Sequence, residues 1–251
     1  MIAIGTAGWS IPRAASAGFG GEGTHLQRYS RVLPVAEINS SFHRSHARKV
    51  YERWAASTPP SFRFAVKLPR TITHDARLRR PRALLGPFLQ GIGGLGAKLG
   101  PLLVQLPPSL EFDARVARHF FETLRADHAG FIACEPRHRT WFDAKAARLL
   151  TDYRVSRVAT DPSPIPEALE PGGWMRRTPR EPALVYYRLH GSPRKYWSRY
   201  PADRLRAWAD GFARLAADAE VWCIFDNTAG GAAIENALEV SGLLPPTSAG
   251  A

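Results

Sequence analysis

The residues most able to do chemistry lie together between Phe131 and Trp141, in the sequence FIACEPRHRTW. An apolar run there is followed by a carboxylate, a guanidinium and an imidazole, on Glu135, Arg137 and His138. The apolar run is typical of a buried strand, so the three side chains are predicted to lie where that strand ends. An anion, a cation and a titratable ring at one strand end indicate a site for proton transfer or anion binding.

Polar side chains follow the other apolar runs of the chain in the same way. Because the carboxyl ends of parallel barrel strands meet on one face, these side chains are expected to converge there as a functional mouth. Structural salt bridges that close the barrel are the alternative. The residues concerned, together with Glu135, are Glu37, Asn39, Lys67, Gln105, Asp161, Arg188, His190, Asp226 and Asn227, and His74 lies in the loop after Lys67.

Eight apolar runs predict the strands that position these residues. Helical spacing of apolar residues separates most of them, and runs that are apolar almost throughout indicate strands buried on both faces. We therefore predict an α/β fold, a single (β/α)8 TIM-barrel-like domain over residues 1–244, with a flexible tail at 245–251. A doubly wound open sheet is the alternative, but it gives no reason for polar residues at every strand end. The predicted strands are 2–5, 35–38, 62–66, 102–106, 131–135, 155–160, 184–189 and 221–225.

Capping side chains mark where several helices begin. Thr24 and Gln27 have the spacing of a capping box, in which each side chain bonds the backbone of the other residue. Asp113 and Asp143 precede helical patterns and can accept hydrogen bonds from the first free N–H groups. His138 follows its strand closely enough to be a capping residue too, which is the alternative to a role in the site.

Two kinds of chemistry fit the predicted mouth. In the first, carboxylates and histidines bind a divalent metal that activates water, although no histidine pair has the HxH or HExxH spacing of metal ligands. In the second, which we favour, a carboxylate acts as general acid or base without a metal and basic side chains hold an anionic substrate. A divalent metal, or any other cofactor, stays open. The predicted catalytic residues are Glu37, Glu135, His138, His190 and Asp226, and the predicted substrate- or anion-binding residues are Asn39, Lys67, His74, Gln105, Arg137, Arg188 and Asn227.

The charge balance indicates an anionic partner or a bias of composition. The chain has 251 residues and a formal net charge of +12. An anionic small molecule, nucleic acid or anionic lipid would complement this charge. The arginines are scattered, however, so a compositional bias explains them as well. Basic and aromatic residues mix in 191–200, GSPRKYWSRY, which is the best local candidate for contacting a phosphate backbone.

Other features of the sequence favour a cytoplasmic protein with no membrane segment. The chain does not begin with the pattern of a signal peptide, and no apolar run approaches the roughly 18 residues that cross a membrane. Cys134 and Cys223 lie in apolar runs and are predicted to be buried free thiols. No obligate protein partner is evident.

Seven motifs, in order along nearly the whole chain, resemble those of the DUF72 (YecE-like) family. They are GTAGWS at Gly5, EINSSF at Glu37, FAVKLPRTITH at Phe64, LGPLLVQLPPS at Leu99, CEPRHRTWF at Cys134, YYRLHGS at Tyr186 and CIFDNTAGGAA at Cys223. The resemblance implies a TIM-barrel-like fold, a function that is biochemically undefined, and site positions that coincide with the strand-end residues above. It also implies an analogy of fold and cleft with barrel-type DNA-repair endonucleases. His43, where the family usually has Tyr, and the segment Pro12–Gly23, which replaces an aromatic motif, are departures that concern the pocket wall.

Three functional hypotheses follow. The first is a hydrolase or lyase that acts on a phosphate-bearing substrate, with nucleic acid among the candidates. The alternative is a nucleic-acid or nucleotide-binding module without catalysis, which a strong salt dependence of affinity without turnover would indicate. A further alternative is an enzyme like the sugar-phosphate isomerases, which needs a metal and a small substrate.

Overall fold

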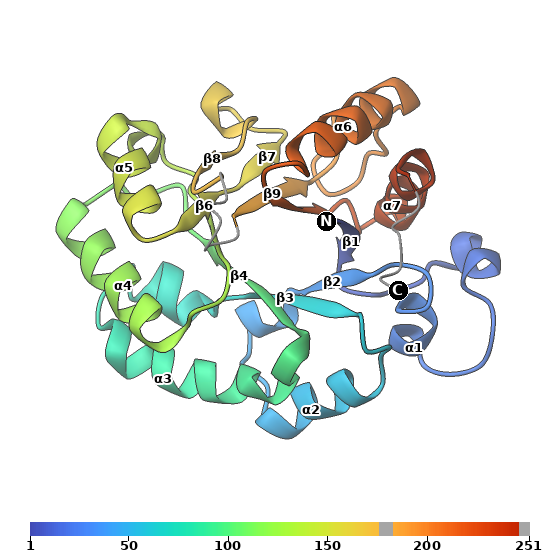
Figure 1. Cartoon of the computed structure of the whole chain (residues 1–251), viewed down its shortest axis with the longest axis horizontal. Coiled ribbons are helices and arrows are strands. Elements are labelled where there is room, and N and C mark those ends of the chain that lie inside the picture. Colours follow the sequence, from blue (N-terminus) through green and yellow to red (C-terminus); the bar gives the residue numbers. More distant parts are fainter. Residues whose placement is uncertain (176–182, 246–251) are drawn as a thin grey trace.

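The computed structural model of the protein describes residues 1–175 and 183–245 (Figure 1). Strands alternate with helices along this part of the chain, as predicted. The strands are β1 Ile2–Ala7, β2 Val35–Ile38, β3 Arg63–Lys67, β4 Leu99–Gln105, β5 Ile132–Glu135, β6 Val155–Arg157, β7 Ala159–Asp161, β8 Gly172–Gly173, β9 Leu184–Leu189 and β10 Glu220–Phe225. The α-helices are α1 His25–Tyr29, α2 Arg48–Ala56, α3 Pro81–Ile92, α4 Ala114–Asp127, α5 Ala144–Asp152, α6 Ala202–Leu215 and α7 Ala232–Leu243. The predicted tail at 245–251 lies, apart from Pro245, outside the described residues.

The ten strands of the described chain form one sheet that curves into a nearly closed barrel. Their hydrogen-bonded order is β7-β9-β10-β1-β2-β3-β4-β5-β6-β8. All neighbouring pairs are parallel except β6 and β8, which are antiparallel. Because β6 and β7 are consecutive along the chain, the ring is completed at Val158, between them. Helices surround the ring (Figure 1), which is the α/β barrel predicted from the sequence.

The strand predicted at 155–160 is two strands in the structure. β6 pairs with β5 on one edge and with β8 on the other, so its backbone is not available to β9. At Val158 the chain donates to the Cys134 carbonyl at 2.8 Å, and beyond that residue β7 pairs with β9. On the β6 side, the Ser156 hydroxyl links the strands by donating to the Leu184 carbonyl at 2.6 Å. The strand is divided because β8 takes the edge of β6 that would otherwise close the barrel.

The two faces of the barrel strands carry separate apolar clusters. The outer cluster packs against the helices and includes Cys134 and Cys223, which are buried free thiols as predicted. The inner cluster fills the barrel. Successive side chains of a strand point to opposite faces, so the residue two positions after an inner apolar residue also points inward. This spacing leads from Val35, Ala65, Leu103, Ala133, Tyr186 and Ile224 to Glu37, Lys67, Gln105, Glu135, Arg188 and Asp226, which form the next inward layer.

The starts of the helices agree with the predicted caps. Thr24 Oγ1 accepts from the Gln27 N–H at 3.3 Å and Gln27 Oε1 accepts from the Thr24 N–H at 2.8 Å, which is the capping box of α1. Asp113 and Asp143 accept from N–H groups in the first turns of α4 and α5. None of the helices within 1–175 and 183–245 is long and apolar enough to cross a membrane.

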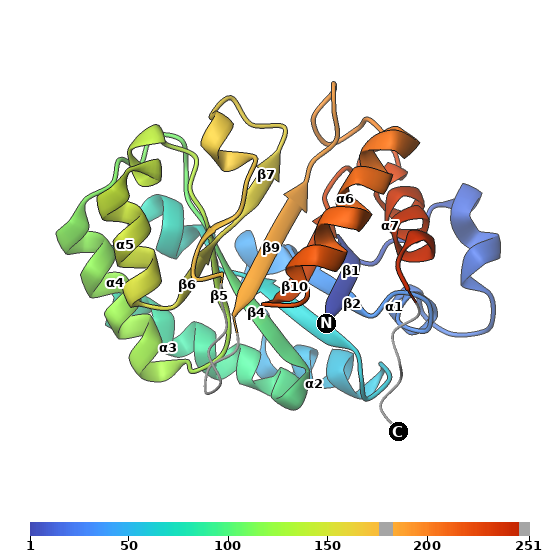
Figure 2. The same ribbon diagram turned by 45° about the horizontal axis from the view of Figure 1, so that its top comes forward.

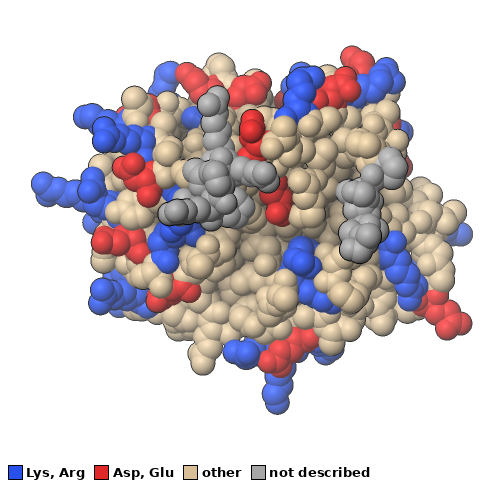
Figure 3. All heavy atoms as spheres, in the orientation of Figure 1, with Lys and Arg blue, Asp and Glu red and all other residues tan. Residues whose placement is uncertain are grey.

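The two ends of the barrel carry different parts of the chain. The face seen in Figures 1 and 3 carries the N-terminus, and in Figure 2 the arrow of β9 points away from the N-terminus, toward the loops that follow the strands. On the face in Figure 3, Lys and Arg lie around the rim among Asp and Glu. The positive charge on that face is dispersed, which agrees with arginines scattered by composition.

Candidate functional site

Arg188 is the centre of the polar layer at the C-terminal end of the barrel. Its side chain is 0% exposed and is surrounded by three carboxylates. Nε and Nη2 donate to the two oxygens of Glu37 at 3.0 and 2.8 Å. Nη1 donates to Glu135 Oε2 at 2.6 Å, and Nη2 also donates to Asp226 Oδ2 at 3.0 Å. Four of the five N–H groups of the guanidinium therefore donate hydrogen bonds, one from Nε, one from Nη1 and two from Nη2.

This arginine connects strands from different sides of the barrel. It extends from β9 to Asp226, directly after the neighbouring β10, and across the interior to Glu37 on β2 and Glu135 on β5. Tyr186, two residues earlier on β9, donates its hydroxyl to Glu37 Oε2 at 2.9 Å. These contacts favour a structural role for Arg188 over the contact with an anionic substrate that the sequence suggested.

The cluster fixes the charge of its own members. Burial alone would raise the pKa of Glu135, but Arg188, Arg137 and His190 hold it well below its usual range. Burial also opposes ionisation of Asp226, whose pKa Arg188 and His190 nevertheless lower. Burial would lower the pKa of Arg188, yet the carboxylates raise it well above its ordinary value. Glu135 and Asp226 are therefore ionised at neutral pH, and neither is available as a general acid.

His190 is held by Asp226 through one ring nitrogen and keeps the other free. Nδ1 lies 2.9 Å from Asp226 Oδ2. Nε2 is buried, has no hydrogen-bond partner among the described residues, and lies 3.7 Å from Glu135 Oε1. When the ring is neutral and donates from Nδ1 to this carboxylate, its lone pair is on Nε2, which is the arrangement of a general base. The ring of Tyr196 packs edge-on against His190, with centroids 5.3 Å apart.

Basic side chains lie beside this cluster and keep contact with solvent. Arg137 donates from Nε to Glu135 Oε1 at 2.9 Å, and 24% of its side chain is exposed. Lys67 is 8% exposed, and burial followed by repulsion from Arg188 lowers its pKa to about 8. Lys195 is half-buried, and burial followed by Arg137 lowers its pKa as well. Arg137 and Lys195 are therefore partly exposed positive groups next to the cluster.

Three further predicted residues complete the border of the site. Asn39 Nδ2 lies 3.5 Å from Asp226 Oδ1, at the limit of a hydrogen bond. Gln105 Nε2 and His74 Nε2 are also 3.5 Å apart, and burial followed by Lys67 lowers the pKa of His74. The structure thus brings most of the sequence-predicted residues to one place.

Two predicted residues make their hydrogen bonds elsewhere. His138 Nδ1 lies 2.9 Å from Thr140 Oγ1 and accepts from the Thr140 N–H at 3.4 Å, so it caps the short 3-10 helix that follows. Asn227 Nδ2 donates to the Ser198 carbonyl and to Asn236 Oδ1, both at 2.9 Å. These bonds favour the capping alternative for His138 and a loop-bracing role for Asn227.

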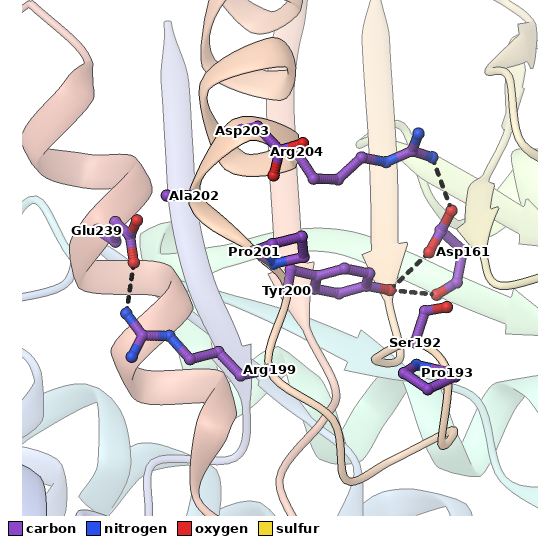
Figure 4. Close-up of a pocket in the computed structure, with 10 residues that line it drawn as sticks. All are labelled: Asp161, Ser192, Pro193, Arg199, Tyr200, Pro201, Ala202, Asp203, Arg204 and Glu239. Atoms are coloured by element: carbon purple, nitrogen blue, oxygen red, sulfur yellow. Dashed lines mark hydrogen bonds and ion pairs between the residues drawn. The ribbon is translucent and has the colours of Figure 1, made fainter.

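Asp161 faces a separate cavity of about 850 Å³ beside α6 and α7 (Figure 4). Asp161 accepts from the Tyr200 hydroxyl at 2.9 Å and pairs with Arg204 at 3.0 Å. Elsewhere on the wall of this cavity, Arg199 pairs with Glu239 at 2.6 Å. The expectation that Asp161 joins the polar ring is corrected, because Tyr200 and Arg204 hold it on the cavity wall.

A divalent metal does not fit the observed arrangement of carboxylates. Among the residues that the structure describes, no group of three or more His, Cys, Asp or Glu side chains is arranged to hold a metal ion. Glu37, Glu135 and Asp226 instead direct oxygens at the guanidinium of Arg188, which lies between them. The three carboxylates are committed to the arginine.

Two residues of the site were not among the predicted site residues. Tyr186 donates to Glu37, and its spacing of two from Arg188 on one strand was the signal that could have found it. Lys195 lies in the loop 191–200, which the sequence marked only as basic and aromatic. No spacing relates it to the strand ends, because the conformation of the loop brings it there.

The fold and this cluster define a barrel protein with a charged site at the C-terminal ends of its strands. The chain belongs to the family described as "Protein of unknown function DUF72", whose model matches residues 3–250. The resemblance noted in the sequence motifs is thereby confirmed.

Curated relatives and solved structures agree with this membership. The UPF0759 protein YecE of Escherichia coli (strain K12) is 30% identical over 171 residues, which cover 66% of this chain and 61% of that protein. The chain thus spans about three fifths of the length of the YecE proteins it matches. The UPF0759 protein YunF of Bacillus subtilis (strain 168) is 27% identical, and the match covers 98% of this chain and 98% of that protein.

Two crystal structures share the fold. A DUF72 family protein of Enterococcus faecalis has a TM-score of 0.78 at 21% identity, covering 97% of this chain and 95% of the other. A DUF72 family protein of Thermotoga maritima has a TM-score of 0.77 at 23% identity, covering 97% and 98%. At these identities the likeness concerns the fold alone.

Replacing Arg188 with Met is expected to lower the free energy of unfolding by about 3–5 kcal/mol, because three buried carboxylates lose their common partner. Urea denaturation measures this change. Arg204→Met is the control, since Arg204 pairs with Asp161 but its side chain is 50% exposed. We expect that change to cost at most about 1 kcal/mol. Equal losses in the two variants would contradict the central role of Arg188.

The free energy of unfolding is expected to decrease as the pH falls into the acid range. The pKa values of Glu135 and Asp226 are lowered by folding, so their contribution to stability is full above about pH 4 and is lost as the pH falls further. Glu135→Gln should therefore flatten the decline of unfolding free energy between about pH 5 and pH 2. Glu122→Gln, at an exposed position of α4, serves as the control. Identical pH slopes in both variants would show that Glu135 is not responsible.

Proposed function

We propose that the protein binds a phosphate-bearing anion at the C-terminal mouth of its barrel and cleaves it as a hydrolase or lyase, with His190 as general base. The observation that carries this proposal is the order of the charges with depth. Glu37, Glu135 and Arg188 are at most 1% exposed and are paired with one another. Arg137 and Lys195 are more exposed than this cluster, whereas Lys67 and Asp226 are each 8% exposed, so the most accessible charges around the cluster are positive.

The proposed roles follow from the partners of each side chain. Arg137 is suited to an oxyanion, because its guanidinium is already oriented by Glu135 and part of it is exposed. Asn39 keeps a buried Oδ1 without a hydrogen-bond partner among the described residues, so it can accept from a substrate hydroxyl. His190 Nε2 takes the proton, and Asp226 stabilises the imidazolium that forms. Glu37 and Glu135, predicted as catalytic, hold Arg188 and Arg137 in place instead.

The test of anion binding uses inorganic phosphate and titration calorimetry. Arg137→Gln should weaken phosphate binding by about tenfold, because a charge-assisted hydrogen bond is lost. Arg139→Gln is the matched control: it removes the same charge two residues away, at an exposed position. Affinity unchanged by Arg137→Gln, or lowered equally by both changes, would contradict a localised anion site.

A second candidate function, binding of single-stranded nucleic acid, is favoured by the loop beside the mouth. Tyr196 and Trp197 are 38% and 48% exposed, unusually high values for large aromatic side chains. The guanidinium of Arg194 lies 4.6 Å from the Trp197 ring centre, and Lys195 Nζ lies 5.3 Å from that of Tyr196. Exposed rings beside cations offer stacking platforms next to phosphate contacts.

For this candidate, Trp197→Ala should weaken binding of a single-stranded oligonucleotide by about tenfold, the loss expected for one stacked base. Fluorescence anisotropy over a range of salt concentrations measures it. The control is Leu243→Ala, which removes another exposed large apolar side chain, on α7. A uniform weak affinity in wild type and both variants would mean that the loop does not stack on bases.

A further inference from the structure

Lys67 is the amine that strand β3 places at the mouth. It is the last residue of β3, and its position pairs with Leu103 of β4. Its carbonyl accepts from the Ser41 hydroxyl at 2.7 Å. The residue is only 8% exposed. A group carried by a rigid strand and partly enclosed is held more accurately than one on a surface loop.

The amine of Lys67 has a ring contact but no partner that would hold its charge. Nζ lies 4.2 Å from the centre of the Phe42 ring, and it makes no hydrogen bond or ion pair within 1–175 and 183–245. Lys98 is the contrast, because its Nζ donates to the carbonyls of Ala55 and Thr58 at 2.6 and 2.5 Å. Lys98 is therefore a structural lysine, whereas the amine of Lys67 is left available.

Four charged groups influence the pKa of this amine. Burial is the largest effect and lowers its pKa, the positive charge of Arg188 lowers it further, and the carboxylates oppose both, leaving a value of about 8. An appreciable fraction of the amine is then neutral near pH 7.5, whereas an ordinary lysine is almost entirely protonated. The groups are Arg188 on β9, Glu135 on β5, Glu37 on β2 and Asp226, which follows β10. The positive charge of Lys67 in turn lowers the pKa of His74, on the π-helical turn Thr71–Asp75.

We infer that Lys67 is a catalytic amine that forms an imine with the carbonyl group of an anionic aldehyde or ketone held at the mouth. This inference rests on the anion site proposed above and names its substrate class. The amine is unpaired and enclosed. Like Lys67, Arg137 and Lys195 lie near Glu135, and they would hold the phosphate or carboxylate of such a substrate. It also favours the lyase over the hydrolase, since an imine activates bonds next to the former carbonyl carbon.

The step balances without a further reagent. The neutral amine attacks the carbonyl carbon, a C–N bond forms, and the carbonyl oxygen takes a proton to give a carbinolamine. The nitrogen then expels that oxygen as water, and the products are an imine and water. No electrons are gained or lost overall. In the protonated imine, the electrons of a neighbouring C–C or C–H bond can flow toward nitrogen when that bond breaks.

The experiment is reductive trapping of the wild-type protein. The full chain is incubated near pH 7.5 with dihydroxyacetone phosphate or pyruvate, sodium borohydride is added, and peptide mass spectrometry locates the secondary amine. We expect Lys67 to be labelled at least about tenfold faster than Lys49 and Lys145, which are exposed. Its labelling should level off above about pH 8, whereas theirs should still rise. Labelling of Lys67 no faster than that of the exposed lysines overturns the inference.

Two measurements separate this inference from the anion site. Lys67→Arg keeps the positive charge but cannot form an imine, so it should lose trapping at position 67. Binding of inorganic phosphate, which tests the anion site, is measured on the wild-type protein. Phosphate binding by the wild type without preferential trapping at Lys67 would refute the imine and leave the anion site standing. Preferential trapping with no phosphate binding would support the amine and refute the proposed phosphate site.

Discussion

The buried arginine of β9 is the constraint on which the rest of the mouth depends. A guanidinium and carboxylates removed from water are stable together only when their charges and hydrogen bonds are matched. Arg188 donates hydrogen bonds to Glu37, Glu135 and Asp226 at once, and Arg137 supplies a second cation at Glu135. Because Glu37 is on β2, Glu135 is on β5 and Asp226 directly follows β10, the same contacts also tie distant strands of the barrel together. All three carboxylates therefore bind Arg188, and the charged groups that lie closer to solvent are mostly positive.

Much of the fold was predictable because the apolar runs of its strands and the helical spacing of its helices are both visible in the sequence. Apolar runs located the strands, and Asp113 and Asp143 located two helix starts. The inward direction of the strand-end residues was predictable too. Glu135 and Arg188 each lie two residues after an inward-facing apolar residue of the same strand, so they point the same way. What failed depended on contacts distant in sequence. Asp161 is drawn away by Arg204, 43 residues later, and the division of one strand depends on a glycine pair that has no apolar pattern.

The loop 191–200 is joined to the site through the backbone as well as through its side chains. The Tyr196 N–H donates to the carbonyl of His190, and its ring packs against the imidazole. Gly191 begins the loop with φ of 90°, and a Cβ there would lie 2.6 Å from the Ser198 carbonyl oxygen, so only glycine fits this turn. The Tyr200 hydroxyl, which accepts from the Gly191 N–H, fixes the other end. A displacement of the loop is therefore transmitted to His190.

The division of the strand at Val158 separates two parts of the barrel whose strands are held together by different contacts. Toward the mouth, Arg188 lies between β7 and β10, opposite Thr160 and Ile224, and backbone hydrogen bonds hold its strand on both edges. Toward the other end, β6 and β9 are linked through one serine hydroxyl, and β8 covers the open edge. The backbone pairing that holds the arginine in place therefore does not depend on the way in which β6 and β9 meet at that end.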